Sequence, residues 1–300
     1  MPTYNFAAYL PEAIESVINQ SYYDFEFIII DDCSDDSSAD VIKSYANKDE
    51  RIISSVNHEN IGMVENWNLC LRRATGEYVK FLFGDDCLSS KKALELMVSV
   101  LDTHHNISLV ASARNVFDYR SSIIGIWSDY KGKIGYPGKR IIKDCLIEQK
   151  NKIGEPSVVM FRKKHAERGF DLRYKQAVDL ELWFHILEQG DFAFIEEPLC
   201  SFRIHSAQQT KLNEASGNLY VESFQLLHDY ANKPYVHMSA LQREYMHFVP
   251  VYSVWKLYKK GRISRQTAVS EIKKHYNVNK FYLLLPFYRL YKFIRRLKKD

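Results

Sequence analysis

Pairs of aspartates follow two short apolar segments of this 300-residue chain, and carboxylates in such positions can bind a divalent metal ion. The β-branched run at residues 25–30 ends in Asp31-Asp32, and the apolar run at residues 78–83 ends in Gly84-Asp85-Asp86. Mg²⁺ and Mn²⁺ prefer hard oxygen ligands and are often held by one or two carboxylates together with phosphate groups. For either pair alone, the ordinary alternative is a solvated turn or helix cap, the commonest use of Asp after a strand.

Strands and helices alternate through the first half of the chain and place both acidic pairs at strand ends. Apolar stripes at helical spacing predict helices at residues 8–20, 39–46, 64–73 and 91–101. Apolar runs predict strands at residues 25–30, 51–56, 78–83 and 108–113. This alternation predicts an α/β fold with a doubly wound, mostly parallel sheet. Because ligands of open α/β sheets bind beyond the carboxyl ends of the strands, both acidic pairs are candidate site residues.

The second half of the chain has fewer clear signals. Residues 114–155 show no clear period, which predicts long loops or short antiparallel pieces around a binding site. Residues 157–161 and 192–195 are strand-like, and residues 179–189 are helical with Asp179 as the N-cap. From about residue 212 the pattern becomes helical and rich in tyrosine. We therefore expect an α/β domain over residues 1–211 and a helical region over residues 212–300.

Composition and charge exclude several classes of protein. Hydrophobic residues make up 46% and aromatic residues 14% of the chain, which excludes a disordered or fibrous protein. Residues 251–300 hold 14 Lys and Arg against Glu271 and Asp300, a net charge of +12, whereas residues 1–250 hold 27 basic and 35 acidic residues, a net charge of −8. An acidic body with a basic tail predicts an anionic partner surface for the tail and no nucleic-acid groove in the body.

Several familiar sequence signals are absent. The five cysteines are widely spaced and form no CxxC pair, which predicts a reducing compartment. No apolar stretch approaches the ~18 to 20 residues that span a bilayer, and the first residues lack the pattern of a signal peptide. The chain also lacks GxxxxGK(S/T) and GxGxxG, which disfavours P-loop enzymes and Rossmann dehydrogenases. If the chain binds a ligand that carries phosphate groups, a metal ion or Arg and Lys side chains would therefore bind them.

Seven short motifs stand in order along the chain. They read PTYN, YLPEAIESVINQSY, FEFIIIDDCSDDSS, NIGMVENWN, ATGEYVKFLFGDD, VDLELW and FRIH. In this order they resemble the family 2 glycosyltransferases, most of all bacterial O-antigen and capsule enzymes, over roughly residues 1–210. The resemblance implies a GT-A fold and the transfer of a sugar, with inversion, from a nucleotide-sugar to a hydroxyl group.

The resemblance also implies roles for the residues at the strand ends. The residues that it places near the nucleotide base and ribose are Pro2, Thr3, Tyr4 and Asp32. Asp31 would be their neighbour on the same strand end, and Tyr4 can stack on the base. Asp85 would face the ribose or the metal, and Asp86 would bind the Mn²⁺ or Mg²⁺ that bridges the diphosphate. The element reads GDD, without the first Asp of a DxD motif, so the division of labour between these two carboxylates stays open.

Asp179, in the VDLELW motif, resembles the general base that removes the proton of the acceptor hydroxyl. In a single displacement the acceptor oxygen attacks the anomeric carbon opposite the leaving diphosphate, and a carboxylate within hydrogen-bond reach takes its proton. Glu181 is the fallback base. The structural alternative is that Asp179 caps the helix that begins there, a role that it can perform alongside catalysis.

Two further motifs complete the site that the resemblance implies. Arg203 would offset the charge of the leaving diphosphate, and His205 would approach the metal or the diphosphate. Arginine suits phosphate oxygens through its planar donors, whereas a lone histidine is more often an ordinary structural residue. Gly154 and Glu155 match the loop that lines the donor sugar and the acceptor, although a simple turn into a strand is the alternative.

The beginning of the chain departs from the family pattern. Relatives usually have an apolar strand before the PTYN element, and here Met1 alone precedes Pro2. We therefore expect the central first strand to be missing, with a loss of backbone pairing and of buried apolar area.

The last residues predict an amphipathic helix with a basic face. Its apolar face comprises Leu283, Leu284, Phe287, Leu290, Tyr291, Ile294 and Leu297. Its basic face comprises Arg289, Lys292, Arg295, Arg296 and Lys299. Cationic amphipathic helices lie in the headgroup region of anionic membranes, which predicts a peripheral enzyme at the inner, cytoplasmic face of the cytoplasmic membrane. The alternative is a helix packed on the α/β domain, kinked or started by Pro286.

The function predicted from the sequence is therefore metal-dependent transfer from a UDP-, dTDP- or GDP-sugar to a lipid-linked or oligosaccharide acceptor in bacterial surface polysaccharide synthesis. A sugar-phosphate nucleotidyltransferase would also use strand-end carboxylates and a metal, but it usually needs a phosphate loop rich in Gly, Arg and Lys, which is absent before Ser34. A third possibility is a binder without enzymatic activity that acts through its basic tail.

Overall fold

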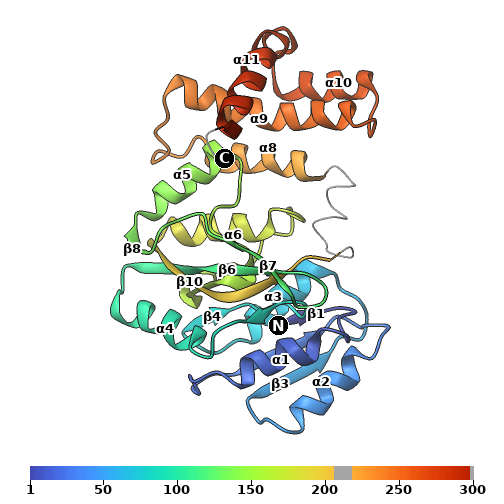
Figure 1. Cartoon of the computed structure of the whole chain (residues 1–300), viewed down its shortest axis with the longest axis vertical. Helices are drawn as coiled ribbons and strands as arrows, with labels where there is room; N and C mark the ends of the chain where they lie inside the picture. The colour runs from blue at the N-terminus through green and yellow to red at the C-terminus, as the bar shows by residue number, and fades with distance from the viewer. Residues whose placement is uncertain (206–217, 298–300) are drawn as a thin grey trace. The chain divides into compact units, whose positions relative to one another are not determined.

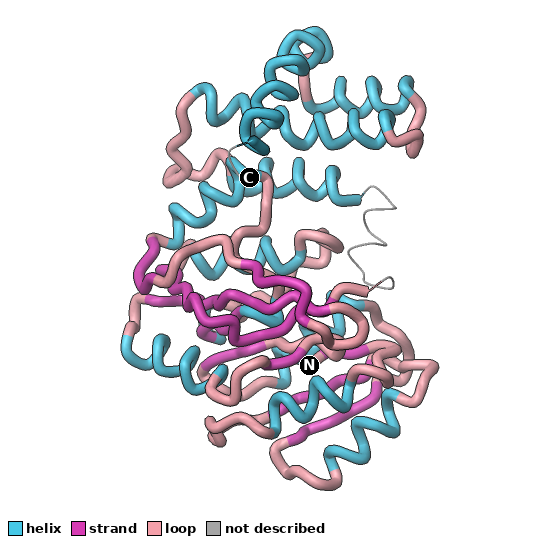
Figure 2. Tube along the Cα trace, viewed as in Figure 1, coloured by secondary structure: helices cyan, strands magenta, loops and turns pink. Residues whose placement is uncertain are grey.

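The computed structural model describes residues 1–205 and 218–297, with side chains for residues 1–205 and 222–292 (Figure 1). The chain forms two compact units. The first comprises Met1–Ile142 and Asn151–Leu212, and the second comprises Lys143–Lys150 and Asn213–Asp300. Within the described residues every strand belongs to the first unit, and Figure 2 shows the second as helices and connecting loops.

Alternating strands and helices build the first part of unit 1, as the sequence predicts. They are α1 (Leu10–Ile18), β2 (Phe27–Asp31), α2 (Ser38–Ala46), β3 (Ile52–Val56) and α3 (Met63–Arg73). Helix α1 buries Leu10, Ala13, Ile14 and Val17, the stripe expected from its periodicity. All five residues of β2 are buried, while α2 packs on β3 and α3 packs on β2. The aspartates that follow β2 are thereby held at the carboxyl end of a buried strand.

A two-residue strand begins unit 1 within the PTYN motif itself, and the absence of a longer apolar strand before this motif stays a prediction. Strand β1 (Pro2–Thr3) pairs in parallel with β2 and completes a three-stranded parallel sheet of order β1-β2-β3. Met1 N–H donates to Ile28 O at 2.6 Å, Ile30 N–H donates to Met1 O at 3.0 Å, and Asp32 N–H donates to Thr3 O at 2.9 Å. The alternate residues Met1 and Thr3 make these bonds, so that Pro2, which has no N–H, falls where none is needed.

A second sheet of seven strands forms the rest of unit 1. Its order is β4-β9-β6-β10-β5, with β7 beside β6 and β8 beside β10. The strands are β4 (Tyr78–Lys80), β5 (Cys87–Leu88), β6 (Ile107–Phe117), β7 (Ile123–Trp127), β8 (Lys133–Tyr136), β9 (Val159–Arg162) and β10 (Asp191–Arg203). The long β6–β10 pair is parallel, and the shorter strands join it in antiparallel pairs. Much of residues 114–155, which the sequence leaves unassigned, is therefore antiparallel sheet.

Helices and 3₁₀ turns connect these strands. They are α4 (Ala93–Thr103), α5 (Gly138–Glu148), η1 (Pro156–Val158), η2 (Lys163–His165) and α6 (Val178–Leu187). Helix α4 packs on β6 and β10, and α6 packs on β6. The carboxyl end of β10 brings Arg203 beside Phe117 of β6 and Ser201 beside Cys87 of β5. The end of β10 therefore lies next to the GDD segment that precedes β5.

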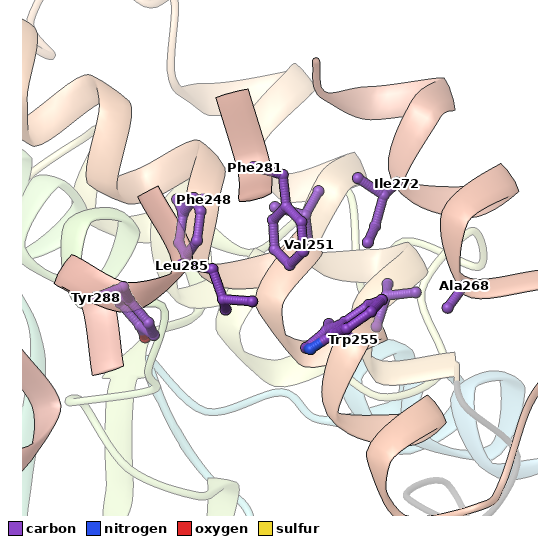
Figure 3. Packing of buried hydrophobic residues seen from close by; sticks show 9 residues of the cluster. Phe248, Val251, Trp255, Ala268, Ile272, Phe281, Leu285 and Tyr288 are labelled. Atoms are coloured by element: carbon purple, nitrogen blue, oxygen red, sulfur yellow. The ribbon is translucent and has the colours of Figure 1, made fainter. Parts of the chain in front are cut away.

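Unit 2 has its own apolar core. Besides the end of α5, its helices are α8 (Asn218–Tyr230), α9 (Ala240–Lys259), α10 (Arg265–His275) and α11 (Val278–Leu297). Phe248, Trp255, Phe281 and Tyr288 pack with aliphatic side chains from α9, α10 and α11 (Figure 3). Ser239 caps α9 with a capping box and Ser264 caps α10, which fixes where these helices begin.

Helix α11 confirms the predicted C-terminal helix, and its apolar residues divide between two faces. Phe281, Leu285 and Tyr288 are buried in the core of unit 2, whereas Leu283, Phe287, Leu290 and Tyr291 are exposed. Pro286 lies inside the helix and does not start it. The side chains of Ile294, Arg295, Arg296 and Leu297, and all of Lys299, lie outside the described part of the structure. No helix in the described ranges is long and apolar enough to cross a membrane.

Candidate active site

Asp31 and Asp32 are both buried at the carboxyl end of β2, and each binds a different loop. Asp31 accepts from Ser34 Oγ at 2.5 Å and from Ser34 N–H at 2.9 Å, which closes the turn after the strand. Asp32 Oδ1 accepts from Asn57 Nδ2 at 2.8 Å and from Ile61 N–H at 2.9 Å, and its Oδ2 accepts from Gly62 N–H at 2.9 Å. Asp32 thus orders the loop between β3 and α3 on the side where the resemblance places the nucleotide.

The PTYN segment lies beside these carboxylates. Thr3 stands opposite Asp31 in the β1–β2 pair, and its hydroxyl is buried without a hydrogen-bond partner. Pro2 is buried, whereas the Tyr4 ring is exposed and its hydroxyl lies 3.4 Å from Asp35 Oδ2. The Tyr4 ring is thus free of a covering side chain at this strand end, and its stacking on a base stays a prediction.

The GDD turn approaches β1 so closely that a Cβ atom at its first position would crowd its neighbours. A Cβ atom on Gly84 would lie 3.1 Å from Thr3 Oγ1 and 3.1 Å from Phe6 Cδ2. The turn is therefore seated against the PTYN segment. The two acidic segments that the sequence singles out are brought together, although they belong to different sheets.

Asp86 is fully buried, and only one of its carboxylate oxygens has a firm partner. Oδ1 accepts from the main-chain N–H of Arg203 at 3.0 Å, and no donor meets the buried Oδ2 with hydrogen-bond geometry. Burial and the neighbouring Asp85 carboxylate raise the pKa of Asp86 well above its usual range, and Ser157 and the Arg203 N–H act in the opposite direction. A divalent cation at Oδ2 would compensate for the burial of the Asp86 charge and for its repulsion by the Asp85 carboxylate.

Arg203 and His205 contact the acidic pair from the end of β10 and the residues just after it. Arg203 is buried; its Nε donates to Asp85 O at 2.8 Å, and its Nη2 donates to Glu12 Oε2 at 2.6 Å. Its Nη1 donates to Asp118 O and to Ser121 Oγ. His205 Nε2 lies 3.0 Å from Asp85 Oδ2. Each guanidinium nitrogen thus has a protein partner, so that Arg203 orders the GDD turn, and its contact with a diphosphate stays a prediction.

Asp179 lies in the first turn of α6, and it is not the N-cap that the sequence predicts. The N-cap is Ala177, which makes no side-chain capping bond. Asp179 is half-buried; its Oδ1 accepts from Leu180 N–H at 2.7 Å and its Oδ2 accepts from Asn151 Nδ2 at 3.1 Å. Burial, with a further contribution from the Glu155 charge, raises the pKa of Asp179 to about 7. A half-buried carboxylate with such a pKa suits a general base at neutral pH.

Glu181, the fallback base, is engaged elsewhere. Both of its carboxylate oxygens accept from Arg168 Nη2 at 2.7 Å. In such an ion pair, lone pairs of both carboxylate oxygens are already used by the guanidinium. Asp179 is therefore the better placed of the two acidic residues in this turn to take a proton from a substrate.

The loop that contains Gly154 and Glu155 lies between the acidic pair Asp85–Asp86 and Asp179 in its electrostatic influence, because Glu155 acts on the pKa of both Asp86 and Asp179. Glu155 forms an ion pair with Arg114, whose Nε lies 2.7 Å from Glu155 Oε2. The Glu155 charge contributes to the raised pKa of both Asp86 and Asp179, so Glu155 lies near both carboxylates. Gly154 has φ of +126°, and a Cβ there would lie 2.4 Å from Val158 Cγ2, so the loop requires glycine.

Four residues that contribute to this site are not predicted from the sequence: Glu12, Lys80, Arg114 and Asn151. Lys80 is half-buried on β4, where its ammonium donates to Ser157 O and has Asp86 among its charged neighbours, and burial of the ammonium lowers its pKa. Arg114 lies in the middle of β6, and Trp127 of β7 covers its guanidinium at 5.5 Å. Glu12 and Lys80 stand inside the motifs YLPEAIESVINQSY and ATGEYVKFLFGDD but have no role assigned there, and Arg114 and Asn151 stand in no motif. Three-dimensional proximity identifies all four.

The residues present fit a metal ion that is completed by its substrate. No cluster of three or more His, Cys, Asp or Glu side chains is arranged as a metal site in residues 1–205 and 218–297. Asp86 nevertheless offers a buried, unpartnered oxygen. Mg²⁺ and Mn²⁺ are commonly held by one or two carboxylates plus the phosphates of a nucleotide, and this arrangement can supply that share of the ligands.

Comparison with solved structures identifies the fold. S. aureus TarS 1–349 in complex with UDP-GlcNAc superimposes with a TM-score of 0.60 at 17% identity, over 86% of this chain and 71% of that one. The mannosyltransferase PcManGT from Pyrobaculum calidifontis, in complex with GDP-Man and Mn²⁺, gives 0.56 at 17% identity, over 96% of this chain and 78% of that one. The fold is therefore GT-A-like, with α/β layers and C-terminal helices, as the sequence predicts.

Sequence comparison identifies the family. Residues 1–170 match Glycosyl transferase family 2, and the chain belongs to this family. An uncharacterized glycosyltransferase of Methanocaldococcus jannaschii is 30% identical over 207 residues, covering 68% of this chain and 69% of the relative. The putative glycosyltransferase EpsE of Bacillus subtilis is 30% identical over 198 residues, covering 63% and 66%. The putative teichuronic acid biosynthesis glycosyltransferase TuaG of Bacillus subtilis is 40% identical over 100 residues, covering 32% and 40%, so the match spans less than half of that relative.

Proposed function

We propose that this glycosyltransferase moves a sugar from a UDP-, dTDP- or GDP-sugar to a hydroxyl group with inversion, with Asp179 as the general base. The observation that carries the proposal is the half-buried Asp179 carboxylate, with a pKa of about 7, in the same site as the acidic pair Asp85–Asp86. The donors bound by TarS and PcManGT support a nucleotide-sugar, and the family membership supports the transfer.

The proposed step is a single displacement. The acceptor hydroxyl gives its proton to Asp179 as its oxygen bonds to the anomeric carbon, and the bond from that carbon to the diphosphate oxygen breaks. The nucleoside diphosphate leaves on the opposite face, which inverts the anomeric centre. Glu155, held by Arg114, keeps negative charge near Asp179 and thereby helps to keep its proton affinity high.

A divalent metal, Mn²⁺ or Mg²⁺, would be held by Asp86, with Asp85 as its neighbour. When bound, it would neutralise charge that develops on the leaving diphosphate. Arg203 keeps the GDD turn in place through Asp85 O and Asp86 Oδ1, and His205 holds Asp85 Oδ2. His205 Nε2 contacts the Asp85 carboxylate. As a metal ligand, His205 would therefore bind the ion beside Asp85. Pro2, Thr3, Tyr4 and Asp32 would surround the base and ribose, with Asp31 supporting their turn.

We assign the acceptor to bacterial surface polysaccharide synthesis, with a lipid-linked or oligosaccharide hydroxyl as the reacting group. TuaG, named as a putative teichuronic acid biosynthesis glycosyltransferase, supports a polysaccharide acceptor. The exposed residues Leu283, Phe287 and Leu290 on α11, together with the net charge of +12 over residues 251–300, support peripheral binding to an anionic membrane at its cytoplasmic face. Such a position would bring the site to a lipid-linked acceptor.

Nucleotide release from a panel of UDP-, dTDP- and GDP-sugars tests the donor half of this proposal, because water can replace the acceptor slowly. We expect release from one donor class that depends on Mn²⁺ or Mg²⁺. Calorimetry with the same panel separates binding from turnover. Absence of binding to every nucleotide-sugar would overturn the proposal.

A further inference from the structure

The side-chain amide of Asn151 has a fixed orientation. Its Oδ1 accepts from the main-chain N–H groups of Ile153 and Gly154, each at 3.0 Å. Because an amide nitrogen cannot accept these bonds, Nδ2 must point the other way. There it donates to Gly154 O and to Asp179 Oδ2, each at 3.1 Å.

The loop that carries Asn151 is itself fixed against α6. Gly154 O also accepts from the indole Nε1 of Trp183 at 3.1 Å, and Trp183 is fully buried one helical turn after Asp179. The same carbonyl thus joins Asn151 to the helix that carries the proposed base. Rotation of the Asn151 amide would break bonds at both of its ends, so this donor is well placed to hold a carboxylate rigidly.

The remaining groups around Asp179 do not hold its Oδ2. Leu180 N–H bonds to Oδ1, at 2.7 Å. Glu155 faces Asp179 as a like charge and is itself paired with Arg114. Among the described residues, Asn151 is therefore the side chain that donates to Asp179, and it favours the ionised carboxylate while Glu155 and burial favour the protonated one.

We propose that Asn151 is a positioning residue that holds the Asp179 carboxylate in the ionised, fixed orientation in which it accepts the substrate proton. This inference rests on the proposed role of Asp179 as the base and adds a residue that no motif indicates. Asn151 acts through Asp179 and touches neither the nucleotide nor the metal ligands in the contacts described above.

Two substitutions separate the loop role of Asn151 from its role toward Asp179. Asn151→Ala removes both sets of bonds. Asn151→Asp keeps an oxygen for the Ile153 and Gly154 N–H groups but replaces the donor to Asp179 with a second carboxylate oxygen. Asn106→Ala is the matched control, because Asn106 Nδ2 donates to Asp191 Oδ2 at 3.0 Å outside the site.

The main readout is the pH profile of kcat/KM for hydrolysis of the most reactive donor, chosen from UDP-N-acetylglucosamine, UDP-glucose, a dTDP-sugar and GDP-mannose. We expect the acid limb to move up by about one pH unit in Asn151→Ala, since a hydrogen bond to a charged group is lost. In Asn151→Asp it should move at least as far. The plateau at high pH should stay within about threefold of the unsubstituted protein, because Asp179 ionises there in every variant.

A second readout does not require activity. The pKa of the Asp179 carboxyl can be followed by ¹³C NMR of Asp-labelled protein, with Asp179→Asn to assign the signal. It should rise in both Asn151 variants and stay unchanged in Asn106→Ala. If the pKa rises but no donor is hydrolysed by any variant, the proposed catalytic function fails and the positioning role with it. If the pKa and the acid limb stay fixed in Asn151→Asp, or move equally in Asn106→Ala, Asn151 is only a loop residue and the inference is overturned.

Discussion

The main-chain N–H of Arg203 donates to Asp86 Oδ1 at 3.0 Å, so the end of β10 fixes the carboxylate that we assign to the metal. The Arg203 side chain adds bonds to Asp85 O and Glu12, and it is almost completely buried. Its guanidinium also lies 4.1 Å from the centre of the Phe117 ring. Arg203 is therefore both a structural centre of this end of the sheet and the support of the GDD turn.

Replacement of Arg203 should destabilise the protein strongly. Arg203→Met keeps much of the side-chain volume but leaves Asp85 O without its donor and removes the guanidinium bonds to Asp118 O, Ser121 Oγ and Glu12. We expect the free energy of unfolding to fall by about 2–4 kcal/mol in urea titration. Arg173→Met is the control, because that ion pair with Asp171 is exposed at the arginine and should change stability by under ~1 kcal/mol. Equal losses in the two variants would contradict the central structural role of Arg203.

Gly84 is the second position where a small change should have a large effect. In Gly84→Ala the new methyl group would meet Thr3 Oγ1 and Phe6 Cδ2 at 3.1 Å, and overpacking of this kind costs about 1–3 kcal/mol. The GDD turn would shift away from the PTYN segment, so affinity for the nucleotide should also fall. Gly125→Ala, where a Cβ atom meets nothing within 4 Å, should leave both properties unchanged. Thermal unfolding and nucleotide calorimetry measure the two effects, and unaltered nucleotide affinity in Gly84→Ala would argue against a shared site.

Metal binding should appear as a change in stability even without a substrate acceptor. Mn²⁺ with UDP or GDP should raise the melting temperature of the unsubstituted protein, because a ligand at 100 times its Kd adds about 2.7 kcal/mol to the free energy of unfolding. Asp86→Asn should lose most of this metal-dependent rise. Without metal, Asp86→Asn should be at least as stable as the parent, since it replaces a buried carboxylate whose pKa is raised.

Asp40→Asn is the control for the metal experiment, because Asp40 is exposed in the first turn of α2. It should keep the full stabilisation by Mn²⁺. A metal-dependent rise that survives in Asp86→Asn would place the ion elsewhere.

The exposed apolar stripe of α11 should govern binding to lipid. Leu283, Phe287 and Leu290 have side chains 67%, 66% and 57% exposed, so their replacement by serine removes apolar surface without opening the core. We expect the triple serine variant to lose most of its co-sedimentation with vesicles that contain phosphatidylglycerol, and the parent to bind phosphatidylcholine vesicles weakly. Leu241→Ser, at another exposed leucine, should bind as the parent does. Unchanged sedimentation of the triple variant would contradict the membrane proposal.

The sequence predicts most of the elements of unit 1 because their signals are local. The apolar run of β2, the stripe of α1 and the acidic turns after the strands each depend on residues close together in the chain. Local signals do not reveal β1, where pairing depends on the backbone of Met1 and Thr3 and not on an apolar run. Across residues 114–155 the sequence predicts long loops or short antiparallel pieces but does not place the strands, because they are specified by their partners.

The candidate site shows the same limit. Asp86 and Asp179 are recognised from motifs. Their altered pKa values, however, depend on burial and on Glu155, which lies outside both motifs in the sequence. Asn151 and Arg114 lie in the unassigned stretch, and their roles follow from bonds to Asp179 and Glu155. Asp31 shows the reverse case: its motif suggests a ligand contact, yet its oxygens accept from Ser34 of its own turn.

We propose Asp179 as the base, and the pH dependence of nucleotide release reports directly on the ionisation of such a base. A base acts in its ionised form, so kcat/KM should rise with pH through about 7 and level off above it. Asp179→Asn should lose at least ~10²-fold activity at pH 8. The Asp179→Asn protein should remain folded at pH 8. Ionisation of a carboxyl group with a raised pKa destabilises the folded protein as the pH rises through that pKa, and an uncharged amide has no such effect.

Glu181→Gln, which removes the charge from the ion pair with Arg168, should keep the same acid limb near pH 7. We expect an acid limb near pH 7 in the parent and in Glu181→Gln, with activity lost in Asp179→Asn. Full activity of folded Asp179→Asn, or a limb near pH 7 that persists in Asp179→Asn and disappears in Glu181→Gln, would contradict it.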